Sequence, residues 1–82
     1  MKKKIAIIGS TGSIGKSLLS ILSNEKKNIK VVLLTAHRSH KNLLRQAKKF
    51  NVKNLIITNY DSYKSAKKFN KNKKIKIYNN FK

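Results

Sequence analysis

The sequence has no cysteine and no proline, and its only acidic residues are Glu25 and Asp61. Without cysteine, the chain has no disulfide scaffold, thiolate metal site or thiol nucleophile. Its uninterrupted apolar runs, such as residues 5–8, are far shorter than the roughly 20 residues that span a bilayer. Gly-Ser-Thr at residues 9–11 also interrupts the apolar region that a signal peptide would need. We therefore expect a soluble, cytoplasmic protein without a membrane partner.

The chain of 82 residues is the size of one small domain. Hydrophobic residues make up 39% of it and aromatic residues 7%. A chain of this length buries only a modest fraction of its surface when it folds. We expect residues 1–82 to form one thin-cored domain.

Basic residues dominate the charge, because 21 Lys and Arg give a formal net charge of +19. Such a charge is typical of nucleic-acid binders, which gain affinity from each phosphate they neutralise. However, Arg38 and Arg45 are the two arginines, so the bidentate groups that read bases and phosphates are scarce. The abundance of Lys, Asn and Ile indicates the coding bias of an AT-rich genome. This favours a solvated basic surface, with a small nucleic-acid-binding domain as the alternative.

Short apolar runs rich in β-branched residues alternate with segments of helical periodicity. The predicted strands are Lys4–Ile8, Val31–Ala36, Asn54–Thr58 and a weaker one around Ile75–Tyr78. The first strand has the composition of one buried on both faces. Residues 70–74, Asn-Lys-Asn-Lys-Lys, are predicted to form a solvated loop.

Three helices are predicted between these strands. Ser39 is the expected N-cap of the second helix, and Asp61 or Ser62 that of the third. The expected apolar faces are Ile14, Leu18, Ile21 and Leu22 in the first helix, Leu43, Leu44, Ala47 and Phe50 in the second, and Tyr63, Ala66 and Phe69 in the third. This alternation predicts an α/β fold with a parallel sheet of about four strands and three covering helices.

A glycine-rich turn lies between the first strand and the first helix, at residues 9–15. Gly9 would permit the tight turn, Gly12 a close approach of a pyrophosphate, and Gly15 tight helix packing. Free amides at the start of the helix would bind the phosphates, and hydroxyls such as that of Ser10 would add donors. The pattern predicts a Rossmann-like dinucleotide site. A nucleoside-triphosphate P-loop is disfavoured, because Ser10 stands where that motif needs glycine.

The end of the second strand bears on the choice of cofactor. NAD sites place an acidic residue there to accept the ribose 2′-hydroxyl, but this segment has none. Arg38 could instead pair with a 2′-phosphate, Ser39 could donate a hydrogen bond, and His37 could line the adenine. We therefore favour NADPH over NADH. His37 and His40 have no third ligand nearby in the sequence, which argues against a metal site.

Two segments, residues 4–15 and 31–39, resemble the amino terminus of the 1-deoxy-D-xylulose 5-phosphate reductoisomerases. The string Gly-Ser-Thr-Gly-Ser-Ile-Gly at residues 9–15 is characteristic of that family. The similarity extends through residues 43–46 and Phe50 into the third strand. It implies NADPH contacts from Thr11 to Ile14 and from His37 to Ser39. Together with the glycine turn, the expected cofactor-binding residues are Gly9, Thr11, Gly12, Ser13, Ile14, His37, Arg38 and Ser39.

The resemblance also implies a reaction. The family rearranges 1-deoxy-D-xylulose 5-phosphate and reduces the intermediate with NADPH to 2-C-methyl-D-erythritol 4-phosphate for isoprenoid synthesis. It uses a divalent metal, Mg or Mn, held by carboxylates. Those acids and the phosphosugar site lie beyond the position of Lys82 in the family. Glu25 and Asp61 are expected to be a surface charge and a helix cap, so we expect neither catalytic residues nor metal ligands here.

The chain is accordingly expected to be an incomplete, amino-terminal part of a longer enzyme, inactive alone, whose full-length form is a homodimer. The first strand would then present an apolar, unpaired edge, which invites self-association. The fourth strand would lie on the opposite side, next to the third. Another NADP-dependent Rossmann-fold reductase with the same glycine spacing remains the alternative enzyme.

Overall fold

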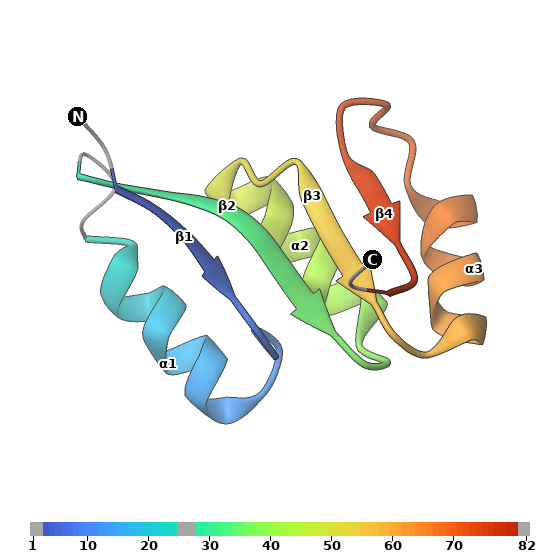
Figure 1. Cartoon of the computed structure of the whole chain (residues 1–82), viewed down its shortest axis with the longest axis horizontal. Helices are drawn as coiled ribbons and strands as arrows, with labels where there is room; N and C mark the ends of the chain where they lie inside the picture. Colours follow the sequence, from blue (N-terminus) through green and yellow to red (C-terminus); the bar gives the residue numbers. More distant parts are fainter. Residues whose placement is uncertain (1–2, 25–27, 81–82) are drawn as a thin grey trace.

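The computed structural model describes residues 3–24 and 28–80. Within them, strands and helices alternate along the chain, as Figure 1 shows. The elements are β1 (Lys3–Ile7), α1 (Ser13–Leu22), β2 (Ile29–Ala36), α2 (His40–Phe50), β3 (Asn54–Ile57), α3 (Tyr60–Phe69) and β4 (Lys76–Tyr78). The predicted order of elements is confirmed. Glu25, expected above to be a surface charge, lies outside the described residues.

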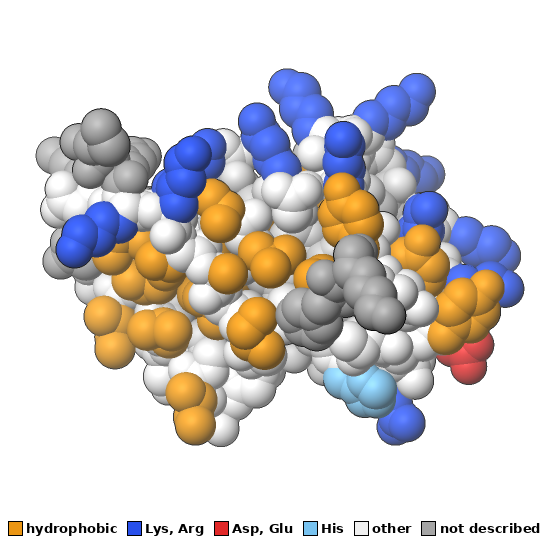
Figure 2. Space-filling view, viewed as in Figure 1, with side chains coloured by type: hydrophobic (Ala, Val, Ile, Leu, Met, Phe, Trp, Pro, Cys, Tyr) orange, Lys and Arg blue, Asp and Glu red, His pale blue; other side chains and the backbone are white. Residues whose placement is uncertain are grey.

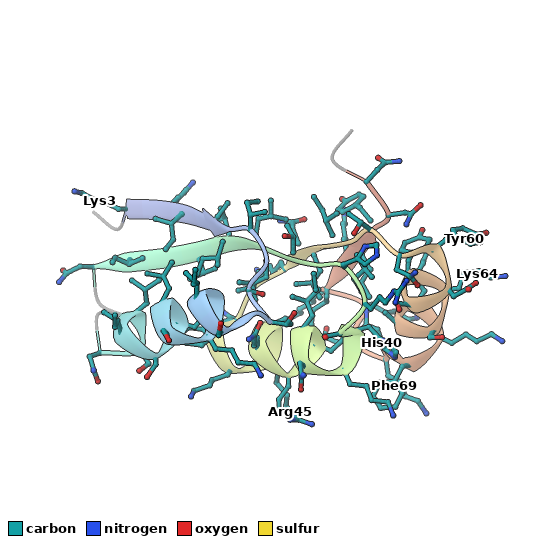
Figure 3. All side chains as sticks on the ribbon, turned by 90° about the horizontal axis from the view of Figure 1, so that it is seen from below. Lys3, His40, Arg45, Tyr60, Lys64 and Phe69 are labelled. Carbon is teal, nitrogen blue, oxygen red and sulfur yellow. The ribbon has the colours of Figure 1, made fainter. Side chains whose placement is uncertain are left out.

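The sheet has the order β1-β2-β3-β4, and each neighbouring pair is parallel. The α/β fold with a parallel sheet is therefore confirmed, including the placement of β4 beside β3. Successive right-handed crossovers in one direction put the connecting helices on the same face of a sheet. Figure 3 shows α1 and α2 together on one side of the strands. The two outer strands, β1 and β4, form the edges of the sheet.

The core lies between the sheet and the helices and centres on β2, α2 and β3. Leu34, Leu43, Leu55 and Ile57 are fully buried there. In α2 the predicted face is confirmed: Leu43 and Ala47 are buried, and Leu44 and Phe50 pack against the core from partly buried positions. In α3 only part of the predicted face is right. Ala66 is buried and Tyr63 half-buried, but Phe69 is 63% exposed.

The first helix buries a different face from the one predicted. Its buried residues are Gly15, Leu19 and Leu22, whereas Ile14 is 85% and Ile21 is 64% exposed. The helix is apolar on more than one side, so periodicity alone does not identify the side that faces the sheet. Gly15 lies on the buried side, where the helix packs tightly against the preceding turn.

The prediction that the first strand is buried on both faces is wrong. In β1 only Ile7 is buried, Ile5 is half-buried, and Ala6 is exposed. Ile8 falls just outside the strand and is 64% exposed. The reason is the position of β1 at the edge of the sheet, where it pairs with β2 alone.

The helix caps also differ in part from the prediction. Asn59, not Asp61 or Ser62, caps α3: its side chain accepts a hydrogen bond from the Ser62 amide at 3.0 Å. Asp61 lies in the first turn, where its charge complements the helix dipole. Ser39 is the N-cap residue of α2, as predicted, but within the described residues its side chain makes no capping bond.

Candidate functional site

The glycine turn connects the carboxyl end of β1 to the start of α1. Gly9 has a φ of 70°, in the left-handed region that glycine adopts without strain. At Gly15, α1 packs directly against the turn. A Cβ on Gly15 would lie 2.5 Å from the Gly9 carbonyl oxygen and 2.6 Å from the Ser10 Cα. The turn and the first helical residues therefore form one tightly packed unit.

Gly12 is the N-cap residue of α1, and it is exposed. A Cβ there would meet the Gly9 carbonyl oxygen at 3.5 Å, an ordinary contact, so the fold itself does not require glycine at this position. Its amide donates to the Gly9 carbonyl at 3.1 Å. A glycine that the fold does not need leaves room for a ligand directly above the start of the helix.

The amides that follow Gly12 are free to bind a ligand. Within the described residues, the structure gives no acceptor to the backbone N–H of Ser13, Ile14 or Gly15. The side chains of Ser13 and Ile14 are exposed as well. Unpaired amides at a helix start, at the positive end of its dipole, bind anions such as phosphate.

Ser10 does not offer its hydroxyl to a ligand, contrary to our prediction. Its side chain is fully buried, and its Oγ donates to Oε1 of Gln46 at 2.7 Å. The Ser10 amide donates to the carbonyl of Thr35 at 2.9 Å. Ser10 thus faces inward and holds the turn, and the hydroxyls that remain available are those of Thr11, which is half-buried, and Ser13.

The second group of candidate residues follows β2. His37, Arg38 and Ser39 are all exposed. Nδ1 of His37 lies 2.6 Å from Oγ1 of Thr58, and the His37 carbonyl accepts from the Asn59 amide at 2.9 Å. The segment is therefore fixed by the loop after β3, while the Arg38 side chain remains in solvent.

The two groups lie at the same end of the sheet. β1 and β2 are parallel neighbours. A hydrogen bond joins Ser10, in the turn after β1, to Thr35, near the end of β2. In parallel α/β sheets, ligands bind outside the carboxyl ends of the strands. A groove of about 420 Å³ runs there along the free edge of β1 and the start of α1, between Ala6 and Leu18.

A second hollow, of about 440 Å³, lies at the opposite end of the sheet. It is lined by Leu22 at the end of α1, by the start of β2 and by Phe50 and Asn51 at the end of α2. The amino ends of parallel strands are not where this class of sheet binds ligands. The hollow also contains no free helix start, so we do not assign it to the site.

The described residues alone do not provide a ligand set for a catalytic metal. In the part of the chain that the structure describes, no three His, Cys, Asp or Glu side chains come together. Asp61 is exposed in the first turn of α3 and belongs to no such group. None of the described helices is both long and apolar enough to pass through a bilayer.

Lysines cover the end of the molecule that holds α3 and β4, as Figure 2 shows. Lys64 and Lys67 lie over the rings of Tyr60 and Tyr63, each about 5.5 Å from a ring centroid. These aromatic faces are therefore covered by cations of the same helix. Such rings are poorly placed to stack on the bases of a single-stranded nucleic acid.

Sequence reasoning missed two residues, Thr35 and Gln46, which hold the glycine turn from outside. Oγ1 of Thr35 accepts from the Gly9 amide at 2.8 Å. Gln46 is half-buried and contacts Ser10 through both atoms of its amide group. The available signal was the position of Gln46 between Leu43 and Ala47, next to the apolar face of α2.

Comparison with known sequences is consistent with this geometry. The model of a protein family described as 1-deoxy-D-xylulose 5-phosphate reductoisomerase matches residues 5–81. Curated relatives of that name from Pelagibacter ubique and Buchnera aphidicola are 54% and 43% identical over 79 and 74 residues, which are 96% and 90% of this chain. The chain spans only 20% and 19% of the lengths of these two relatives.

Solved structures show the same fold. The reductoisomerase of Zymomonas mobilis, in complex with NADPH, superimposes with a TM-score of 0.88 at 28% identity over 95% of this chain and 21% of its own. A magnesium complex of DOX-P reductoisomerase gives a TM-score of 0.81 at 24% identity, over 95% of this chain and 19% of its own. The four-stranded arrangement with three helices thus matches a domain that is part of a longer chain.

Proposed function

The chain belongs to the 1-deoxy-D-xylulose 5-phosphate reductoisomerase family, and on that premise we propose that it binds NADPH at the carboxyl ends of β1 and β2. The single observation that carries the proposal is the row of unpaired amides at the start of α1, in a chain similar to a reductoisomerase solved with NADPH. Residues 1–82 correspond to the amino-terminal portion of the family.

The diphosphate of NADPH would lie against the start of α1. The amides of Ser13, Ile14 and Gly15 would donate to its oxygens, with the hydroxyls of Thr11 and Ser13 beside them. The absence of a side chain at Gly12 allows this approach, and Gly9 sets the direction in which the chain enters the turn. Because the dipole of α1 adds positive potential at this point, the site favours an anion.

The adenosine end of NADPH would lie over the segment that follows β2. Arg38 is exposed there and can form a charge-assisted pair with the 2′-phosphate. Ser39 can add a hydrogen bond, and the ring of His37, fixed by Thr58, can border the adenine. The segment has no carboxylate to bind the free 2′-hydroxyl of NADH, so the site favours NADPH.

The activity of the whole family is a wider proposal. We propose that this chain supplies the cofactor site of an enzyme that rearranges and reduces 1-deoxy-D-xylulose 5-phosphate in isoprenoid synthesis. The phosphosugar, a divalent metal and a second subunit would then be bound by parts of the enzyme that correspond to the remaining four fifths of the relatives. We propose that the catalytic residues and the metal ligands lie in those other parts as well, since no three His, Cys, Asp or Glu side chains come together among the described residues.

Fluorescence titration with NADPH and NADH tests the cofactor proposal. We expect Arg38→Gln to weaken NADPH binding by about tenfold, the effect of losing one charge-assisted hydrogen bond, and to leave NADH binding unchanged. Arg45→Gln is the matched control, because Arg45 is exposed on α2 and points away from the sheet in Figure 3. Equal losses in the two variants would attribute the effect to net charge instead.

A generic oligonucleotide, titrated at two salt concentrations, tests the nucleic-acid alternative. Phosphate-driven binding weakens steeply as salt rises. We expect NADPH to remain bound at physiological salt while the oligonucleotide is released. An oligonucleotide that displaces NADPH under those conditions would overturn the proposed function.

A further inference from the structure

The first half of the glycine turn is held by side chains from two other elements. Thr35, in β2, accepts from the Gly9 amide through Oγ1 at 2.8 Å and from the Ser10 amide through its carbonyl at 2.9 Å. Gln46, in α2, accepts from the Ser10 hydroxyl at 2.7 Å and donates from Nε2 to the Ser10 carbonyl at 2.9 Å. Every polar group of Ser10 is therefore paired with one of these two residues.

The Gln46 contact is specific to an amide side chain. The Ser10 hydroxyl needs an acceptor, and the Ser10 carbonyl needs a donor. The carboxamide offers one of each, at the spacing of the two Ser10 atoms. Ser10 and Thr35 are both buried, with 0% and 3% of their surfaces exposed. Losing Gln46 would leave the buried Ser10 carbonyl without its donor, and it would leave the Ser10 hydroxyl with only the longer bond of 3.4 Å to the Thr35 carbonyl. Such a loss is costlier than that of an exposed hydrogen bond.

Gln46 also joins the two halves of the proposed cofactor site. It lies on α2, whose first residue follows Arg38 and Ser39 directly, and it binds Ser10, which precedes the free amides of α1. Resting on the proposed function, we propose that Gln46 is a positioning residue, which sets the diphosphate-binding turn relative to the 2′-phosphate-binding segment. It contacts the turn and not the cofactor.

This role predicts a selective loss. A ligand that contacts both halves requires the turn to be correctly placed, whereas adenosine 2′-phosphate contacts only the segment after β2. Without Gln46 the turn relaxes, the amides of α1 move from their places, and the dinucleotide loses affinity. The fragment keeps its affinity, because Arg38 and Ser39 still precede an intact α2.

Gln46→Leu and Gln46→Asn are the test variants. Leucine removes both polar contacts at similar volume, and asparagine keeps the amide but is one methylene too short to reach Ser10. Arg45→Gln is the control for a change on the exposed side of the same helix. Val52→Ala, which alters a core residue that is only 1% exposed, is the control for a general loss of stability.

Three quantities are measured for each variant: the affinity for NADPH, the affinity for adenosine 2′-phosphate, and amide hydrogen exchange by NMR. We expect both Gln46 variants to weaken NADPH binding by about tenfold and to change binding of the fragment less than about twofold. Exchange should accelerate at the Gly9 and Ser10 amides, while the amides of β3 exchange as in the wild type. The Val52 variant should instead accelerate exchange in β3.

The outcomes separate the two proposals. A wild-type chain that does not bind NADPH overturns the proposed function, and the inference with it. A wild-type chain that binds NADPH, with Gln46 variants that bind equally well, overturns the inference alone. Parallel losses for NADPH and the fragment, or faster exchange in β3 as well as in the turn, reduce Gln46 to a stabilising residue and also overturn it. If the leucine variant does not fold, the asparagine variant decides by the same measurements.

Discussion

The two edge strands of the sheet, β1 and β4, differ in the residues that surround them. At the β4 end, the edge strand is only three residues long and lysines surround it on α3 and in the loop before it. β1 has five residues, Ile8 is exposed directly after it, and Ile14 and Ile21 are exposed on α1. Figure 2 shows the apolar side chains gathered over β1 and α1 and most lysines at the other end.

Short, charged edges protect a sheet against pairing with other chains, whereas longer apolar edges do not. The candidate site lies at the edge of the sheet formed by β1, where few residues belong to the core. The geometry of the glycine turn therefore depends on a close contact at Gly15 and on polar bonds from Thr35 and Gln46. In β3, by contrast, fully buried side chains such as Leu55 and Ile57 hold the backbone in place.

The largest effect is expected from Gly15→Ala. The added Cβ would lie 2.5 Å from a backbone oxygen and 2.6 Å from a backbone carbon, so the helix or the turn must move. We expect a loss of about 3 kcal/mol in the free energy of unfolding, because overpacked sites cost up to about that much. Thermal unfolding followed by circular dichroism should show a fall in Tm of about 15 °C for a chain of this size.

Gly12→Ala is the matched control for that experiment. Its Cβ would make only an ordinary contact of 3.5 Å, so we expect Tm to change by less than about 4 °C. NADPH affinity should nevertheless fall, because the methyl group would occupy the space proposed for the diphosphate. Equal stability of the two alanine variants would mean that Gly15 does not fix the packing of α1.

An intermediate effect is expected at the helix starts. Within the described residues, α1 and α2 begin without a side-chain cap, whereas Asn59 caps α3. Asn59→Ala should therefore lower the free energy of unfolding by about 1 kcal/mol. Ser39→Ala should change it by less than about 0.5 kcal/mol, because the Ser39 side chain makes no capping bond. Urea denaturation measures both, and equal losses would contradict the difference between the two helices.

The smallest effect on stability, but a visible one on association, is expected from a charge placed on the exposed face of α1. Ile21 is 64% exposed beside other apolar residues, and Phe69, on α3, is 63% exposed among lysines. Ile21→Lys and Phe69→Lys add the same charge at equal exposure. Each should change stability by less than about 0.5 kcal/mol. In sedimentation velocity, Ile21→Lys should reduce self-association and Phe69→Lys should not. An equal reduction in both variants would mean that the exposed face of α1 is not the surface through which the chain associates.

Local pattern was sufficient for much of the fold and for the outline of the site. Alternating apolar runs predicted the strands and helices, and the glycine spacing predicted a tight turn at Gly9 between β1 and α1. The structure adds that Gly9 lies in the left-handed region. Pattern was insufficient where two faces of one helix are apolar, as around Ile14 and Leu19. The cap of α3 was missed because Asn59 and Ser62 are both good capping residues, and only the start of the helix distinguishes them.

The order of residue types along the chain determined the α/β class, the place of the glycine turn and the absence of an acid after β2, because each depends on neighbours in sequence. Tertiary structure decided that β1 lies at an edge, that Ser10 faces inward, and that Gln46 holds it from another helix. Ser10 and Gln46 are 36 residues apart, and they pair only once β2 lies beside β1 and α2 has packed on the sheet. A hydrogen bond between distant residues leaves no periodic trace in a sequence, so only the folded chain reveals it.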